Sequence, residues 1–70
     1  MQESEKNKLI GTFEELKGIE ETAFNLYADL LKEKISSHEA EVVDSIRQDE
    51  KRHMEIAQEI IDLIKAEKLA

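Results

Sequence analysis

The chain has 70 residues, no proline, no cysteine and only two glycines, and 39% of its residues are charged. This length allows one small domain, which neither a disulfide nor a thiolate zinc site can stabilise. The net charge of −7 argues against a nucleic-acid-binding protein, which needs a basic patch. We find no membrane-spanning apolar run and no signal-peptide pattern, so we expect a cytoplasmic protein with no membrane partner.

A first amphipathic helix is predicted over about residues 12–35. One of its faces collects residues at alternating steps of four and three, as an amphipathic helix requires. These residues are Leu9, Phe13, Leu16, Glu20, Ala23, Tyr27 and Leu30. Thr12 with Glu15 matches a capping box, which places the start of regular helix near Thr12, with residues 1–8 either frayed or continuing the helix. Lys32 and Lys34 are expected near its end, where cations suit the helix dipole.

A turn is predicted near residues 36–37, followed by a second helix over about residues 38–65. Ser36 and Glu39 form a second candidate capping box at the start of this helix. Its inward face repeats at steps of three and four and consists of Val43, Ile46, Glu50, His53, Ala57, Ile60 and Ile64. Because the connection is short, we expect the two helices to form an antiparallel hairpin.

The predicted fold is therefore all-α, with residues 1–70 forming a single helical hairpin domain. A hairpin of two amphipathic helices leaves an apolar face that nothing in the chain covers. The simplest way to cover it is a two-fold homodimer that forms a four-helix bundle.

Three polar residues interrupt the apolar faces at one level of this hairpin. Glu20 lies 16 residues before Ser36, whereas Glu50 and His53 lie 14 and 17 residues after it. At 1.5 Å per helical residue, all three are about 21–26 Å from the turn. Since buried carboxylates and imidazoles are costly unless they are compensated, we expect these side chains to meet and to bind a metal ion.

Two chains would supply four carboxylates and two imidazoles across the dimer interface. Di-iron and di-manganese bundle proteins use this ligand set: a Glu from each of two helices and a Glu-x-x-His motif from each of the other two. Imidazole and carboxylate both suit iron, and carboxylates can bridge two cations. We therefore expect Glu20, Glu50 and His53 to be metal ligands, with Glu50 bridging, Glu20 terminal and His53 binding through one ring nitrogen.

The sequence at these positions resembles a known superfamily. Glu20-(x6)-Tyr27 followed by Asp49-Glu50-Lys51-Arg52-His53 resembles the ligand pattern of ferritin-like proteins. The Asp-Glu-Lys-Arg-His run is similar to rubrerythrins, and the two-helix architecture is most similar to encapsulated ferritins. The resemblance covers about residues 12–65. It implies a half-ferritin that completes a di-iron site by dimerising and then oxidises ferrous iron.

The resemblance also implies partners and cofactors. These are two iron ions per dimer, with manganese or zinc as substitutes, and O₂ or H₂O₂ as the oxidant. The dimer would be the minimal unit of a ring or decamer, and an encapsulin-type shell would enclose it as a nanocompartment. Lys68-Leu69-Ala70 does not resemble the short apolar peptide that docks encapsulated ferritins in such a shell.

The expected function is that of a ferroxidase for iron storage or detoxification, and two alternatives remain open. The same site could use peroxide as its true substrate, as in rubrerythrin-like scavenging. The chain could also be a non-catalytic helical assembly module, in which the Glu–His layer or a zinc ion fixes the register of the bundle. Tyr27 is two turns from Glu20 on the same face. Its phenol would either support the metal ligands or take part in redox chemistry, or its ring would simply pack in the core.

Overall fold

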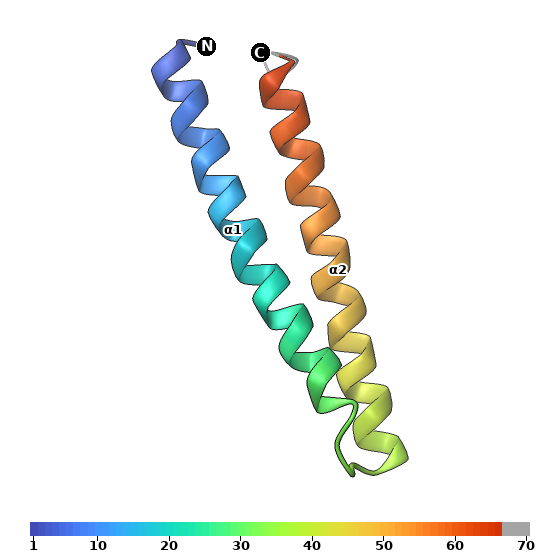
Figure 1. The fold of residues 1–70 in the computed structure, drawn as a ribbon. Helices are drawn as coiled ribbons and strands as arrows, with labels where there is room; N and C mark the ends of the chain where they lie inside the picture. Colours follow the sequence, from blue (N-terminus) through green and yellow to red (C-terminus); the bar gives the residue numbers. More distant parts are fainter. Residues whose placement is uncertain (67–70) are drawn as a thin grey trace.

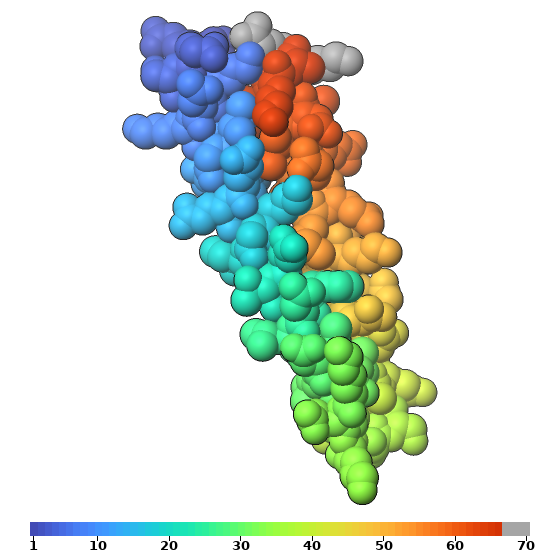
Figure 2. All heavy atoms as spheres, in the orientation of Figure 1, coloured from blue at the N-terminus to red at the C-terminus, as the bar shows by residue number. Residues whose placement is uncertain are grey.

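The protein is an antiparallel hairpin of two long α-helices in the computed structural model, which describes residues 1–66. Residues 67–70, including the Lys68-Leu69-Ala70 end, lie outside the described residues. Helix α1 (Glu3–Leu30) and helix α2 (Ser37–Lys65) run side by side, with the start of α1 and the end of α2 at one end and the turn at the other (Figure 1). The Cα atoms extend over 51 × 16 × 10 Å, so the molecule is an elongated rod (Figure 2). The all-α hairpin prediction is confirmed.

Helix α1 begins nine residues earlier than the capping box at Thr12 predicted. The Thr12 hydroxyl donates to the carbonyl of Lys8 at 3.0 Å, as a threonine inside a helix does, so Thr12 is not a cap. Gln2 provides no side-chain cap, and its carbonyl accepts from the N–H of Lys6. Glu3 and Glu5 lie in the first turn, where their charges are favourable to the helix dipole.

Helix α1 also ends at Leu30, five residues before the predicted boundary. The N–H groups of Lys32 and Glu33 donate to the carbonyls of Asp29 and Leu30 at 3.0 Å, so the last turn tightens to the i→i+3 pattern. Lys32 and Lys34 therefore lie in the connection just beyond the end of α1 rather than in its last turn.

The capping box predicted at the start of α2 is present. The Ser36 hydroxyl accepts from the N–H of Glu39 at 3.1 Å, and the Ser36 N–H donates to the Glu39 carboxylate at 3.0 Å. The N–H of Ser36, and after it the Ser36 hydroxyl, favour the ionised Glu39 carboxylate and hold its pKa below its usual range. Ser36 is extended, with φ −68° and ψ 160°, so the chain must leave the helical conformation before α2 can begin.

The two helices meet along what we call the inner seam, a set of buried or half-buried positions repeating at steps of three and four. In α1 it comprises Lys6, Ile10, Phe13, Lys17, Glu20, Phe24 and Tyr27, and in α2 Ala40, Val43, Arg47, Glu50, Met54, Ala57, Ile61 and Ile64. Only Ala57, Ile61 and Ile64 are fully buried among residues 1–66. The hairpin alone therefore has a very small core.

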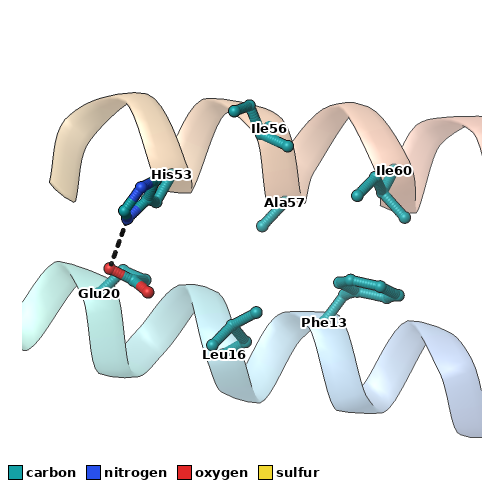
Figure 3. A pocket seen from close by; sticks show the side chains of 7 residues that line it. All are labelled: Phe13, Leu16, Glu20, His53, Ile56, Ala57 and Ile60. Atoms are coloured by element: carbon teal, nitrogen blue, oxygen red, sulfur yellow. Dashed lines mark ion pairs between the residues drawn. The ribbon is translucent and has the colours of Figure 1, made fainter. Parts of the chain in front are cut away.

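A second, mostly apolar stripe, which we call the outer stripe, follows the inner seam one residue earlier along most of both helices. It comprises Leu9, Thr12, Leu16, Ile19, Ala23, Leu26 and Leu30 in α1, and Val42, Ile46, Asp49, His53, Ile56, Ile60 and Leu63 in α2. Most of these residues are exposed, with Ile19 and Leu26 retaining 61% and 63% of their surface. Leu16 of α1 and Ile56 and Ile60 of α2 line one hollow, so the two halves of the stripe share one face of the hairpin (Figure 3).

Candidate metal centre

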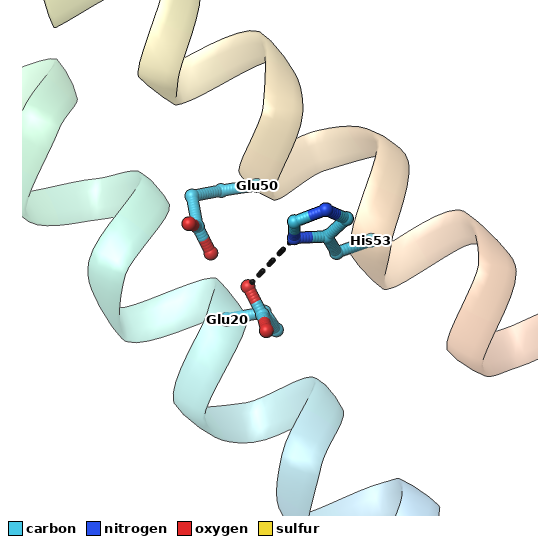
Figure 4. Close-up of side chains that lie close together, drawn as sticks. All are labelled: Glu20, Glu50 and His53. Carbon is cyan, nitrogen blue, oxygen red and sulfur yellow. Dashed lines mark ion pairs between the residues drawn. The ribbon is translucent and has the colours of Figure 1, made fainter.

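The three predicted ligands converge between the two helices. Each of Glu20, Glu50 and His53 offers one ligand atom, and these atoms all lie within 4.8 Å of one another. Glu20 projects from α1, and Glu50 and His53 project from successive turns of α2 toward it (Figure 4). Helical spacing explains this arrangement, because residues at i and i+3 lie on the same face.

The surroundings of the three side chains differ. Glu20 lies in the inner seam, where its side chain keeps only 18% of its surface exposed, and its Oε2 is 3.5 Å from Nδ1 of His53. His53 belongs to the outer stripe and is 54% exposed, which is more than the predicted inward orientation implied. Glu50 is half-buried, and its carboxylate makes no hydrogen bond or ion pair with any other residue in the range 1–66. A half-buried carboxylate without a partner is a favourable position for a cation.

Two cations flank the carboxylates in the inner seam but are bound elsewhere. Lys17 donates to Oε1 of Gln58 at 2.5 Å. The Arg47 guanidinium pairs with Asp44 at 2.7 Å and lies 5.3 Å from the centre of the Phe24 ring. Within the described range, therefore, neither lysine nor arginine side chains neutralise Glu20 or Glu50. Lys17 and Arg47 each precede a candidate ligand by three residues, a spacing from which both cations could have been placed in the inner seam.

The ligand group borders a hollow of about 310 Å³ on the face that carries the outer stripe. Glu20 and His53 form one end of this hollow (Figure 3). Its other lining residues are apolar, namely Phe13, Leu16, Ile56, Ala57 and Ile60. The candidate ligands therefore lie at the edge of the surface that nothing in the hairpin covers.

Tyr27, Asp49 and His38 lie outside this group. Tyr27 is half-buried in the inner seam, two turns nearer the connection than Glu20, and its hydroxyl has no hydrogen-bond partner among residues 1–66. Asp49 is exposed in the outer stripe, one helical turn from His53. His38 is exposed in the first turn of α2, far from the ligands.

One chain thus offers two carboxylates and one imidazole, half of the ligand set of a dinuclear carboxylate site. A scan against protein-family models, a search of curated proteins and a search of solved structures each returned no match. Within residues 1–66, neither helix is long and apolar enough to cross a membrane.

Proposed function

We propose that the chain is a ferroxidase that dimerises through the outer stripe and oxidises Fe²⁺ at a site shared by the two copies. The observation that supports this is the convergence of Glu20, Glu50 and His53 at the edge of an uncovered apolar face. A second copy on this face would bring the two half-sites together. The resemblance to half-ferritins leads to the same function from the sequence.

Charge balance supports two divalent ions in such a dimer. Four carboxylates from Glu20 and Glu50 of both copies neutralise two Fe²⁺ ions, and the two imidazoles add neutral ligands. Lys17 and Arg47 are held by Gln58 and Asp44, so they do not compete with the metal for these carboxylates. Metal binding and dimerisation would then be thermodynamically coupled.

Iron is the substrate of the proposed reaction. With dioxygen, two Fe²⁺ ions each give up one electron, and O₂ takes up these two electrons and two protons to form H₂O₂. With peroxide, the same two electrons and two protons cleave the O–O bond and yield two water molecules. The protein would hold two ions side by side, so that both electrons reach one oxidant. Glu50 would bridge the ions, while Glu20 and His53 would each bind one of them.

Aerobic oxidation of Fe²⁺, followed by ultraviolet absorbance, tests this function with two matched pairs of variants. Glu20→Gln and His53→Ala each remove a ligand, and we expect each to slow oxidation at least about 100-fold, since even an outer-shell substitution at a metal site costs 10–100-fold. Glu21→Gln and His38→Ala alter exposed residues of the same types outside the group, and they should oxidise iron at the rate of the parent protein. Equal rates in all four variants would refute the ferroxidase assignment.

Peroxide as the preferred oxidant is a variant of the same proposal. Single-turnover rates with O₂ and with H₂O₂ distinguish the two, because a peroxide scavenger should react faster with H₂O₂ at equal concentrations. The choice of oxidant does not alter the ligand set.

One observation favours a purely structural role instead. Glu20 contacts His53 across the two helices, and such a contact could fix their register. A structural layer predicts that removing either carboxylate destabilises the metal-free protein. The proposed metal site predicts instead that removal of the Glu50 carboxylate stabilises the protein without metal.

A further inference from the structure

We propose that Gln58 is a positioning residue of the candidate metal centre: its side-chain amide holds the Lys17 ammonium away from Glu20 and thereby sets the affinity of the ligands for divalent cations. This inference rests on the ligand group of the proposed function and concerns its affinity. It does not depend on whether bound iron is oxidised.

Lys17 is well placed to compete with a metal ion for Glu20. It lies three residues before Glu20 in α1, and residues at this spacing are neighbours on one helix face. Both side chains are half-buried in the inner seam, where water screens charges less than on an open surface. The flexible four-carbon stem of a lysine can reach a carboxylate one turn away. An ammonium on Glu20 would neutralise one of the two carboxylates that each copy offers to a metal ion.

A hydrogen bond to the other helix keeps Lys17 from this position. Its Nζ donates to Oε1 of Gln58 at 2.5 Å, and no ion pair joins it to Glu20 in the described part of the chain. Gln58 follows His53 by five residues, so it lies farther from the connection than the ligands do. Neither Lys17 nor Gln58 lines the hollow beside the ligands. The ammonium is therefore held outside both the ligand group and the hollow.

Asp62 fixes the orientation of the Gln58 amide. The Nε2 group of Gln58 donates to Oδ1 of Asp62 at 2.9 Å, one helical turn further along α2. A side-chain amide has one acceptor end and one donor end, whereas an ionised carboxylate only accepts. Asp62 therefore turns the donor end of the amide toward itself and leaves the amide oxygen for Lys17. Its exposed carboxylate also places a negative charge beyond the amide, which favours the ammonium on that side.

The second cation of the inner seam, Arg47, is held differently and is the less easily released of the two. It precedes its own ligand, Glu50, by three residues. Its Nε and Nη2 donate to Asp44 at 3.1 and 2.7 Å, and its guanidinium lies 5.3 Å from the centre of the Phe24 ring. Arg47 is thus already paired with a charge, whereas the partner of Lys17 is a neutral amide. Loss of a single hydrogen bond therefore releases the lysine.

The contact between Lys17 and Gln58 could instead serve only to join the two helices. Removing a contact of that kind would alter the stability of the hairpin but would bring no charge to the ligands. The two roles separate in a double variant, because neutralising Lys17 removes the competing charge while the contact stays broken.

Mn²⁺ binding tests the positioning role, with free Mn²⁺ measured by electron paramagnetic resonance at one protein concentration. We expect Gln58→Leu to weaken Mn²⁺ binding at least about 10-fold, the effect typical of a residue that supports a metal site from outside its ligands. Gln58→Leu combined with Lys17→Met should bind Mn²⁺ as tightly as the parent protein, because the released charge is gone. Gln48→Leu is the matched control at an exposed glutamine of α2 and should leave the affinity unchanged.

Asp62→Ala tests the same contact from an exposed position, where the substitution does not disturb the inner seam. We expect a smaller loss of Mn²⁺ affinity than in Gln58→Leu, and Lys17→Met should again cancel it. A general effect of removing one negative charge would persist in that double variant.

Equal Mn²⁺ affinities in the parent protein, Gln58→Leu and Asp62→Ala would overturn the positioning role, and so would a loss that Lys17→Met does not relieve. Iron oxidation by the parent protein is measured separately. The expected pattern of Mn²⁺ affinities without iron oxidation would refute the ferroxidase function alone, whereas oxidation with equal affinities would refute only the positioning role. A parent protein that binds neither Mn²⁺ nor Fe²⁺ would overturn both.

Discussion

Glu50 is the candidate ligand whose contribution to stability depends most on whether a cation is bound. It is half-buried and unpaired within the described part of the chain, while the neighbouring carboxylate of Glu20 is already in contact with His53. Loss of hydration without a compensating partner makes a carboxylate at such a position unfavourable in the metal-free protein. A bound cation would reverse the sign of this contribution.

Replacing Glu50 with leucine separates the metal site from a structural polar layer. In EDTA we expect Glu50→Leu to raise the free energy of unfolding by about 1 kcal/mol, because it removes a partly desolvated charge. The increase in Tm that Mn²⁺ or anaerobic Fe²⁺ gives the parent protein should be absent from this variant. Thermal unfolding followed by circular dichroism at one protein concentration measures both effects. The exposed Glu55→Leu variant is the control and should keep its response to metal. Destabilisation by Glu50→Leu in EDTA would instead support the structural layer.

The N-terminus of α2 is held by the reciprocal bonds between Ser36 and Glu39, and this element makes the hairpin sensitive to acid. The pKa of Glu39 in the folded chain lies below the ordinary value of 4.5, because the Ser36 N–H and hydroxyl both stabilise its ionised form. A depressed folded pKa adds stability above the unfolded pKa, and this stability is lost as the pH falls through the folded pKa.

Glu39→Gln should therefore reduce the loss of stability below about pH 4.5, since glutamine keeps the capping box but does not titrate. Thermal unfolding between pH 5 and pH 3 tests this, with the exposed Glu41→Gln as the control that should retain the acid sensitivity of the parent protein. Ser36→Ala should cost about 1 kcal/mol at neutral pH, as the loss of an N-cap does. If Glu39→Gln lost as much stability between pH 5 and pH 3 as the parent protein does, the role of the Glu39 carboxylate in acid sensitivity would be contradicted.

The start of α2 was predicted well from the sequence, whereas the start of α1 was placed too late. Ser36 and Glu39 are the correct residue types at the correct spacing, and no competing structure was available to them. Thr12 and Glu15 have the same spacing, but Thr12 bonds back to Lys8 inside a helix that continues to Glu3. Local motifs alone could not show this, because α2 offers α1 a surface to pack against along its whole length.

The predicted ligands were correctly brought together because helical rise fixes their distance from the turn, whatever the details of the connection. What spacing alone could not provide was the division of each apolar face into two stripes. In α2, Val43 and Ala57 belong to the inner seam, whereas Ile46 and Ile60 belong to the outer stripe. A face that alternates between two contact surfaces is suited to the centre of a four-helix bundle, where each helix packs against two neighbours.

The molecule as a whole buries only three side chains completely within its described part, so its stability should depend on assembly. Leu26→Lys tests this at the most exposed apolar residue of the outer stripe, which retains 63% of its surface. Because a buried leucine contributes about 1.5–3 kcal/mol, the dimer should dissociate at least about 10-fold more readily, and its Tm should fall.

Sedimentation at several protein concentrations measures this effect, and Asn25→Lys is the matched control. Asn25 is the exposed neighbour of Leu26 and lies outside the outer stripe, so its replacement adds the same charge without altering the proposed interface. Equal sedimentation of the two variants and the parent protein would argue against assembly through this face.

The start of α1 and the end of α2 lie at one end of a rod that is 51 Å long, and the connection lies at the other (Figure 1). A reporter domain fused before α1 and one fused after α2 would therefore both start from the end of the rod away from the connection. The position of the fusion thus decides little, and either fusion leaves the connection between the helices accessible.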